Sequence, residues 1–253
     1  MFSVSLLQWL TLLGSGLLTG ITKTGLPGLG AAVAPLMAAV FPVRASVAIT
    51  LPMLIVADIV AIIYFRRHVV RSHLVRLVPA ALVGIIAGTL LMRVIDDLQL
   101  RLLIATIVVG TVVASTVFGS SLRDGKSRPI PLWIAVLIGV LAGATSMVSN
   151  ASGPIVTAYL LAMKLPKNEF MGTGAWYYFV LNVMKVPFHL AIGTMTSATL
   201  ALDAVAVIAV ITGTVIGIAI IRRLADKTFR VAAVVIAMLA AVHLTVSAFL
   251  NIA

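Results

Sequence analysis

The sequence predicts an all-α polytopic membrane protein made of two inverted-topology repeats, each a broken helical hairpin followed by three transmembrane helices. The class follows from composition, because 62% of the 253 residues are hydrophobic and only 10% are charged, whereas soluble domains carry about 25% charged residues. The mean hydropathy is +1.21. Two further observations, an internal duplication and a matched pair of breaks in the apolar runs, predict the arrangement of the helices.

The duplication is visible where glycine and polar residues interrupt the apolar sequence. In one register, Gly16, Gly20, Thr22 and Gly30 fall on Gly139, Gly143, Thr145 and Gly153. At identical spacings, Gly84, Gly88, Arg93, Asp97 and Arg101 match Gly213, Gly217, Arg222, Asp226 and Arg230. We therefore divide the single membrane domain into a first repeat, residues 1–125, and a second repeat, residues 126–253.

Each repeat opens with an apolar run that a Gly- and Pro-rich stretch interrupts. The first break is residues 22–30, TKTGLPGLG, and the second break is residues 149–154, SNASGP. Proline removes a backbone donor and glycine loosens the helix. In lipid the freed backbone groups must be buried in protein or line a polar cavity. Paired interruptions at matching positions of two halves are the best sequence pointer to a transporter's binding site.

The remaining elements follow from apolar runs bounded by basic links, because each run must satisfy its own backbone hydrogen bonds as a helix. In the first repeat we expect helices at about 4–21, 29–41, 44–65, 77–92 and 102–118. In the second we expect them at about 132–147, from the second break to 163, and at 170–192, 200–221 and 231–250. The second arm of each broken segment is short.

Charge distinguishes two topologies. If each broken segment crosses the membrane once, there are eight crossings, but the basic link 222–230 falls outside and the uncharged link 191–197 falls inside. If each segment instead enters and returns as a hairpin, thirteen of the 18 Lys and Arg residues lie on the cytoplasmic side and three lie outside. The positive-inside rule favours the hairpins. They place the two repeats in inverted orientation and both termini on the periplasmic side of an inner membrane.

The two breaks carry many donors for an anion. A second arm that begins inside the membrane, at Gly28–Gly30 or Ser152–Gly153, presents free N–H groups and a positive helix end. The candidate substrate-binding residues are Thr22, Lys23, Gly28, Gly30, Ser149, Asn150, Ser152, Gly153, Asn182 and Lys185. The alternative is that these small polar residues only satisfy broken backbone.

Three titratable residues lie at membrane depth: Lys23, Asp58 and Lys185. An ionised group there is costly and is a functional hypothesis by default. Two cations against one carboxylate leave a positive centre that suits an anionic substrate, and Asp58 is the candidate proton carrier. The alternative is that Asp58 pairs with one lysine as a structural lock while the other lysine reaches the interface.

The repeated G-x-x-x-G-x-T opening, the second-repeat motif SNASGPIVTAYLLAMKLPK and the aromatic helix that ends YFVLNVMKVP resemble the sulfite exporter TauE/SafE family of membrane permeases. The likeness spans nearly the whole chain. The resemblance implies secondary transport, usually export, of sulfite and of sulfur-containing or carboxylate organic anions. The first break departs from the family's usual glycine run at Lys23 and Pro27.

The expected function is therefore secondary transport of small anions such as sulfite or sulfonates by alternating access, with protons as the coupling ion. An anion channel is the nearest alternative. An intramembrane enzyme lacks a motif, since neither H-E-x-x-H nor G-x-S-x-G occurs. We expect no cofactor and no metal, and without cysteine there are no thiolate ligands. The net charge of +11 is topogenic and does not indicate nucleic acid as a partner. The oligomeric state stays open.

Overall fold

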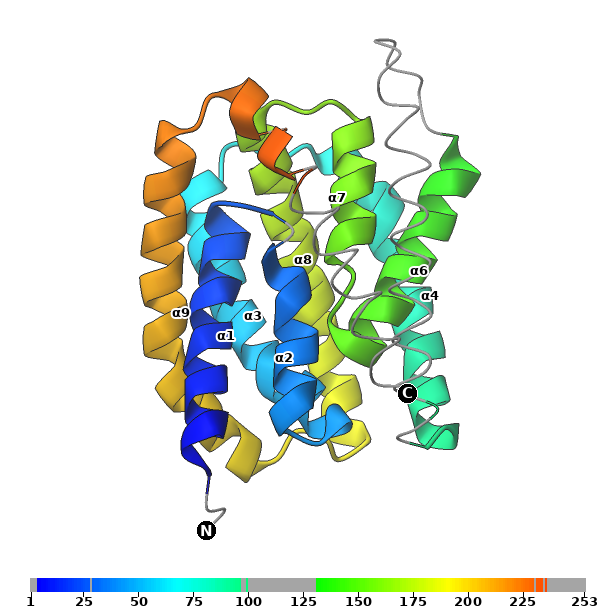
Figure 1. The fold of residues 1–253 in the computed structure, drawn as a ribbon. Coiled ribbons are helices and arrows are strands. Elements are labelled where there is room, and N and C mark those ends of the chain that lie inside the picture. The colour runs from blue at the N-terminus through cyan, green and yellow to red at the C-terminus, as the bar shows by residue number, and fades with distance from the viewer. Residues whose placement is uncertain are drawn as a thin grey trace.

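The computed structural model describes residues 4–27, 29–96, 99, 131–229, 231–233 and 235. The expected helix at 102–118, most of the one at 231–250, and Gly28 lie outside this part of the chain. Every element described is helical (Figure 1). The elements are α1 (Leu6–Thr24), η1 (Leu29–Ala32), α2 (Val33–Val40), α3 (Val43–Phe65), α4 (Arg71–Val94), α6 (Leu132–Ser149), α7 (Gly153–Ala162), α8 (Lys167–Ala191) and α9 (Ser197–Arg223).

The first broken segment folds as a hairpin. Helix α1 rises from the end that holds the N-terminus, and α2 returns toward that end (Figure 1). Gln8, in the first turn of α1, donates from Nε2 to the carbonyl of Val40 at the end of α2, at 2.9 Å. With a rise of 1.5 Å per residue, α1 is about 28 Å long and α2 about 12 Å. The second arm is thus short, as expected.

The boundaries at the first break differ from those expected. Helix α1 continues regularly to Thr24, so Thr22 and Lys23 are helical residues and not part of an irregular stretch. The second arm starts at Val33, after the 3₁₀ turn η1, and not at Gly28–Gly30. The physical reason is that Lys favours a helix and Thr disfavours it by less than about 1 kcal/mol, so that the chain first leaves helical geometry at Gly25.

The second broken segment is also a hairpin, and it enters from the opposite end. Helix α6 descends and α7 ascends (Figure 1). Asn150 terminates α6 in the left-handed region at φ 55°, a conformation that asparagine tolerates better than most residues. Helix α7 then begins at Gly153 with Pro154 in its first turn, where proline's missing donor costs nothing. The expected start at Ser152–Gly153 is confirmed.

The closest helix–helix contacts join a helix of one repeat to a helix of the other. Helices α1 and α9 run in parallel, because Gly16 lies against Ala206 and Gly25 against Gly217; a Cβ on Gly25 would be 2.7 Å from the Gly217 Cα. Helices α4 and α6 pair in the same way. There, a Cβ on Gly139 would lie 2.8 Å from the Leu77 carbonyl oxygen, and Gly88 packs on Ala144. Each opening helix therefore packs on the Gly-x-x-x-Gly helix of the other repeat, and small residues permit this approach.

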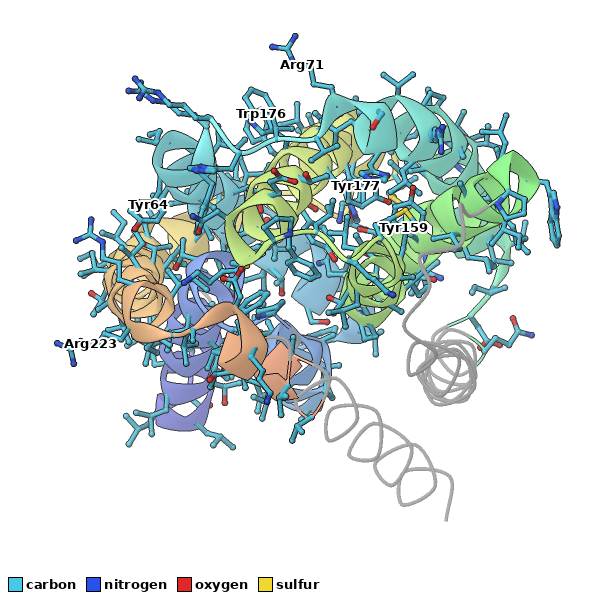
Figure 2. All side chains as sticks on the ribbon, turned by 90° about the horizontal axis from the view of Figure 1, so that it is seen from above. Tyr64, Arg71, Tyr159, Trp176, Tyr177 and Arg223 are labelled. Atoms are coloured by element: carbon cyan, nitrogen blue, oxygen red, sulfur yellow. The ribbon has the colours of Figure 1, made fainter. Side chains whose placement is uncertain are left out.

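Basic residues gather at one end of the bundle. Arg222 donates to the Tyr64 hydroxyl at 3.0 Å, and the Lys167 ammonium donates to the Leu224 carbonyl at 2.5 Å, which joins the ends of α3 and α9 to the start of α8. Viewed toward this end, Arg71 and Arg223 project outward (Figure 2). We call it the basic end. Helix α4 already begins at Arg71 rather than at Leu77, so part of the expected basic link is helical.

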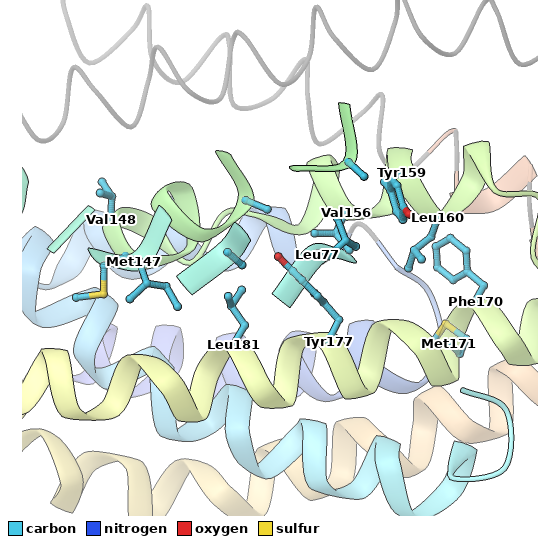
Figure 3. Packing of buried hydrophobic residues seen from close by; sticks show 14 of the residues in the cluster. Leu77, Met147, Val148, Val156, Tyr159, Leu160, Phe170, Met171, Tyr177 and Leu181 are labelled. Carbon is cyan, nitrogen blue, oxygen red and sulfur yellow. The ribbon is translucent and has the colours of Figure 1, made fainter. Parts of the chain in front are cut away.

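Four of the described helices, α3, α4, α6 and α9, are long and apolar enough to cross a membrane. Large apolar side chains face outward on them, as Ile208 and Val215 do on α9 with exposed fractions of 72% and 61%. Inside, α4, α6, α7 and α8 pack around a hydrophobic cluster that includes Tyr159, Tyr177 and Leu181 (Figure 3). Apolar side chains thus cover the outer surface of the long helices as well as filling the interior, as in a multi-pass α-helical membrane protein.

Candidate functional site

A cavity of about 80 Å³ lies where the two broken segments meet in the middle of the bundle. Its walls come from α1, the stretch around η1, α3, the second break, α7 and α8. A water molecule needs roughly 10–15 Å³ on this measure, so the space admits a small polyatomic ion. The lining includes Thr19, Thr22, Lys23, Gly30, Thr50, Ser146, Asn150, Ser152, Gly153, Tyr178 and Asn182.

Lys23 and Asp58 form a buried ion pair at one side of the cavity. The Nζ of Lys23 lies 2.7 Å from Oδ1 of Asp58, and their side chains are 8% and 0% exposed. The second carboxylate oxygen, Oδ2, accepts a 2.7 Å hydrogen bond from Asn182 Nδ2. Helices α1, α3 and α8 are thus joined through one carboxylate. Lys23 and Asn182 also line the cavity, whereas Asp58 lies behind them.

Tyr178 completes this wall. The Lys23 ammonium lies over its ring, 3.9 Å from the centroid, a cation–π contact that stabilises the charge away from water. The Tyr178 hydroxyl donates to the Gly153 carbonyl at 3.4 Å. One side chain therefore connects the lysine of the first repeat to the second break. Sequence reasoning did not select Tyr178, although its spacing from Asn182 and Lys185, i, i+4 and i+7, places the three on one face of α8.

Lys185, less than one turn after Asn182 on α8, forms a second network. Its ammonium is fully buried and donates to three neutral oxygens: the Ser146 carbonyl at 3.2 Å, the Ser146 hydroxyl at 2.9 Å and Asn150 Oδ1 at 2.6 Å. Asn150 in turn donates from Nδ2 to the Val47 carbonyl of α3 at 2.9 Å. The lysine does not reach the interface, so that part of the structural-lock alternative does not hold. Its charge stays behind the cavity wall that Ser146 and Asn150 form.

The two networks start from matching residues on α1 and α6, but their partners on α3 and α8 differ in register by about one helical turn. The register that puts Gly16 on Gly139 puts Lys23 on Ser146. In the first repeat, the α1 residue is the cation and its partner on α3 is the carboxylate. In the second, the α6 residue is a hydroxyl and its partner on α8 is the cation. The arrangement of the helices is repeated while the chemistry of the pair is changed, so the site is asymmetric in charge.

The structure brings most of the predicted site residues together. Those that line the cavity are Thr22, Lys23, Gly30, Asn150, Ser152, Gly153 and Asn182. Asp58 and Lys185 each lie one hydrogen bond behind it. Ser149 does not line it, because its hydroxyl donates to the Thr145 carbonyl within α6 at 3.0 Å. Gly28 lies outside the described residues. Ser146 was not among the selected residues, although the repeat register with Lys23 could have indicated it.

A second, smaller cavity of about 60 Å³ adjoins the first. It lies between α2, the first turns of α3 and the end of α6, and Ser149 is among its walls. Thr50 and Asn150 line both cavities. The central cavity extends toward Phe170 and Met171 at the start of α8, and the second extends toward Val43 at the start of α3. Asn150 and its bond to Val47 therefore lie between spaces that extend toward opposite ends.

Two hydroxyls in the central cavity have no partner in the described part of the chain. They belong to Thr19 and Thr22 on α1. Buried polar groups are nearly always hydrogen-bonded in proteins, so unpaired hydroxyls in a polar cavity are available to water or to a ligand. Together with the lysines they offer donors and positive charge. Within the described residues no group of His, Cys, Asp and Glu side chains could hold a metal ion.

A multi-pass helical bundle with two broken hairpins that meet at a central cavity, lined in part by Lys23 and by hydroxyl and amide groups, defines a membrane transport protein. A family model described as sulfite exporter TauE/SafE matches residues 12–244, and the chain belongs to that family. This is a family of transporters and not of enzymes, and the expected membership is confirmed. No curated protein and no solved structure matches the chain.

Proposed function

We propose that this protein is a secondary transporter that exports small anions, sulfite or sulfonates among them, by alternating access with proton coupling. The observation that carries the proposal is the central cavity, where the two breaks converge with two buried lysines against one buried carboxylate. A site with surplus positive charge in a low-dielectric setting selects an anion. The apolar lining near Leu160, Phe170 and Met171 would accommodate the organic part of a sulfonate.

Anion recognition would use neutral donors beside the charges. An oxyanion can accept hydrogen bonds from the unpaired hydroxyls of Thr19 and Thr22 and from the hydroxyl of Ser152. Lys23 supplies a full positive charge at the cavity wall. Lys185 supplies a second positive charge directly behind the wall, where it is hydrogen-bonded to Ser146 and Asn150. Hydrogen bonds to charged groups contribute about 1.5–3 kcal/mol each. A few such bonds would be enough for binding on the order of micromolar after the cost of ordering the ligand.

Proton coupling would follow from the Lys23–Asp58 pair. While Asp58 is ionised it holds the Lys23 ammonium at 2.7 Å. Protonation of the carboxylate removes that attraction and leaves Lys23 to an incoming anion, so proton and anion binding reinforce one another. A divalent anion that leaves with one proton still moves a net negative charge outward. An inside-negative membrane potential favours this by about 2.3 kcal/mol per 100 mV.

Inverted repeats and alternating access are supported by the directions of the helices. Helices α1 and α6, which match in the repeat register, run in opposite directions, as do α4 and α9 (Figure 1). Helix α1 packs on α9, and α6 packs on α4. Each of these two helix pairs therefore combines one helix from residues 1–125 with one from residues 126–253. Rocking of these pairs around the fixed cavity would expose it to either side, with Asn150 between the two cavities.

The basic end would face the cytoplasm of a cell with an inner membrane. Arg66, Arg67, Lys167 and Arg222 lie at this end, while the uncharged turn between α8 and α9 lies at the other. By the positive-inside rule, the N-terminus is then periplasmic. The inverted arrangement puts the C-terminus on the same side.

Counterflow in proteoliposomes tests the proposal. Purified protein is reconstituted in vesicles loaded with unlabelled sulfite, and uptake of trace labelled sulfite is followed with and without an imposed pH gradient. A transporter accumulates label transiently above equilibrium, and the pH gradient changes the extent. Simple equilibration would establish the anion channel instead, and no anion flux from correctly folded protein would refute transport of these substrates.

A further inference from the structure

The structure contains a second buried carboxylate that the proposed anion site does not use. Asp203, in the second turn of α9, is 4% exposed. Neither of its carboxylate oxygens has a hydrogen-bond partner within the described residues, and no ion pair involves it there. A carboxylate inside a membrane bundle is costly and functional by default. A buried carboxylate without a protein partner can be neutralised by a small cation or proton that binds and leaves.

The position of Asp203 follows from helix packing. On the buried face of α9 it precedes Ala206 by about one turn. A Cβ on Gly16 of the parallel helix α1 would lie 3.2 Å from the Ala206 carbonyl oxygen. Asp203 therefore lies about one turn below the level of Gly16, toward the end that holds the N-terminus. It is about 9 Å along α9 from Ser197.

A file of hydroxyls connects this level with the central cavity. Ser15, Thr19 and Thr22 are spaced i, i+4 and i+7, so they lie on one face of α1. All three hydroxyls are buried and without a partner in the described chain. Thr19 and Thr22 line the central cavity beside Lys23. In the other direction, Thr199 lies one turn before Asp203 on the same face of α9, at the capped start of the helix.

Within the described residues, no charged side chain of the neighbouring helices forms an ion pair or hydrogen bond with Asp203. Helix α9 packs mainly on α1 and α3. The charged residue of α1 is Lys23, which pairs with Asp58 of α3. Arg44, at the start of α3, donates to the Ile95 carbonyl at 2.5 Å. His189, at the end of α8, contacts Thr194 through Nδ1 at 2.8 Å. The side chains that cluster on the neighbouring α9 positions, Leu202 and Ala206, are apolar.

We propose that Asp203 and the hydroxyls of Ser15, Thr19 and Thr22 form a proton route between the periplasmic face and the Lys23–Asp58 pair. During export, the proton that Asp58 carried with the anion leaves the Asp58 carboxylate and passes through water held by the α1 hydroxyls to Asp203, which it neutralises. Asp203 then releases the proton to the periplasm and regains its negative charge. This deepens the proposed function, on which it rests, by giving the coupling proton a route from the cavity wall at Thr19 and Thr22 toward the periplasmic end, whereas the anion cavity extends toward the other end.

A proton fits this route better than Na⁺. Sodium sites in transporters use carbonyls that are freed where helices unwind. Helix α9 is unbroken at Asp203 and α1 is unbroken from Ser15 to Thr22, so their carbonyls stay engaged in helical hydrogen bonds. Hydroxyls and one carboxyl group, each of which both donates and accepts once protonated, can instead pass a proton along.

The test uses Asp203→Asn, Thr19→Val and Ser15→Ala in the full-length protein, with Thr212→Val as the matched control. Thr212 lies on the exposed side of α9 and bonds only to its own helix. Sulfite-coupled proton flux into vesicles with a trapped pH dye should fall at least about tenfold in Asp203→Asn and clearly in the two hydroxyl variants. Sulfite affinity in detergent should stay within about twofold in Asp203→Asn and Ser15→Ala, because neither residue lines the central cavity. The control should match the wild type.

Wild-type coupled flux in folded Asp203→Asn would overturn the route, and so would flux that follows Na⁺ instead of pH. Infrared difference spectroscopy of the substrate-free protein gives a second readout. On acidification, the wild type should gain the C=O stretch of a protonated carboxyl group that Asp203→Glu shifts and Asp203→Asn lacks. Absence of that band would refute proton binding at Asp203 even if a variant folds poorly. Failure of anion transport in the wild type would refute only the proposed function.

Discussion

Asp58 and Asn182, which occupy nearly equivalent positions in the two repeats, meet in a 2.7 Å hydrogen bond between α3 and α8. If the two repeats are inverted as we propose, equivalent residues touch only near the axis that relates them, and this contact would mark that axis. The amide donates to the carboxylate, which in turn holds Lys23. The contact joins the two repeats through the group that we propose to carry the coupling proton.

Asp58→Asn should abolish gradient-driven transport and leave sulfite binding measurable. The amide keeps the size of the carboxylate and can still bond with Asn182, but it cannot take up a proton. Accumulation in proteoliposomes under a pH gradient and calorimetric titration in detergent are the two measurements. A well-folded variant that still concentrates sulfite in response to protons would eliminate Asp58 as the carrier.

Removing one partner of the Lys23–Asp58 pair should be more damaging than removing both. Lys23→Met leaves a fully buried carboxylate with Asn182 as its remaining partner, and breaking a buried pair costs about 3–5 kcal/mol. Lys23→Met combined with Asp58→Asn should recover most of that loss, because no unpaired charge remains. Unfolding titrations with sodium dodecyl sulfate compare the free energies. A double variant as unstable as the single one would show that the pair contributes through packing and not through charge.

Asn150→Gly should weaken sulfite binding about tenfold or more. Glycine keeps the left-handed backbone at this position, but it removes the oxygen that lies 2.6 Å from the Lys185 ammonium and the donor to Val47. A hydrogen bond to a charged group contributes about 1.5–3 kcal/mol, or one to two decades of affinity. The matched control is Ser149→Ala, whose hydroxyl bonds within α6 and whose affinity should change less than about twofold. If Asn150→Gly and Ser149→Ala changed the sulfite affinity equally in calorimetric titrations, the anion would bind away from Asn150.

Cysteines introduced at Arg67 and Lys227 should react with an impermeant reagent only from the cytoplasm, and one at Thr194 only from outside. Arg67 follows the end of α3 and Lys227 follows the end of α9, both at the basic end, and Thr194 lies in the uncharged turn after α8. Labelling of intact cells and of inverted vesicles gives the two directions. External labelling at Lys227 would exclude the inverted topology and restore eight plain crossings.

Much of the fold could be predicted because lipid leaves few choices. Apolar runs such as 43–65 and 197–223 must be helices, and glycine, proline and asparagine mark where helices stop. The predicted start of α7 was correct because a proline such as Pro154 is favoured in the first turn of a helix. The end of α1 was not, because Thr22 and Lys23 are polar and were counted with the break, although polarity alone does not end a helix.

The sequence by itself determined the membrane class, the duplication, the two breaks and the three charged residues at membrane depth, since composition and spacing are local properties. Only the tertiary structure decided which lysine pairs with Asp58, that Lys185 is held by Ser146 and Asn150, that Ser149 lies outside the central cavity, and that Tyr178 lines it. The physical reason is that each contact joins helices far apart in the chain, and their rotation about their own axes is set by packing. Close approach of Gly16, Gly25, Gly88 and Gly139 to the opposite repeat fixes that rotation and thereby selects which side chains meet.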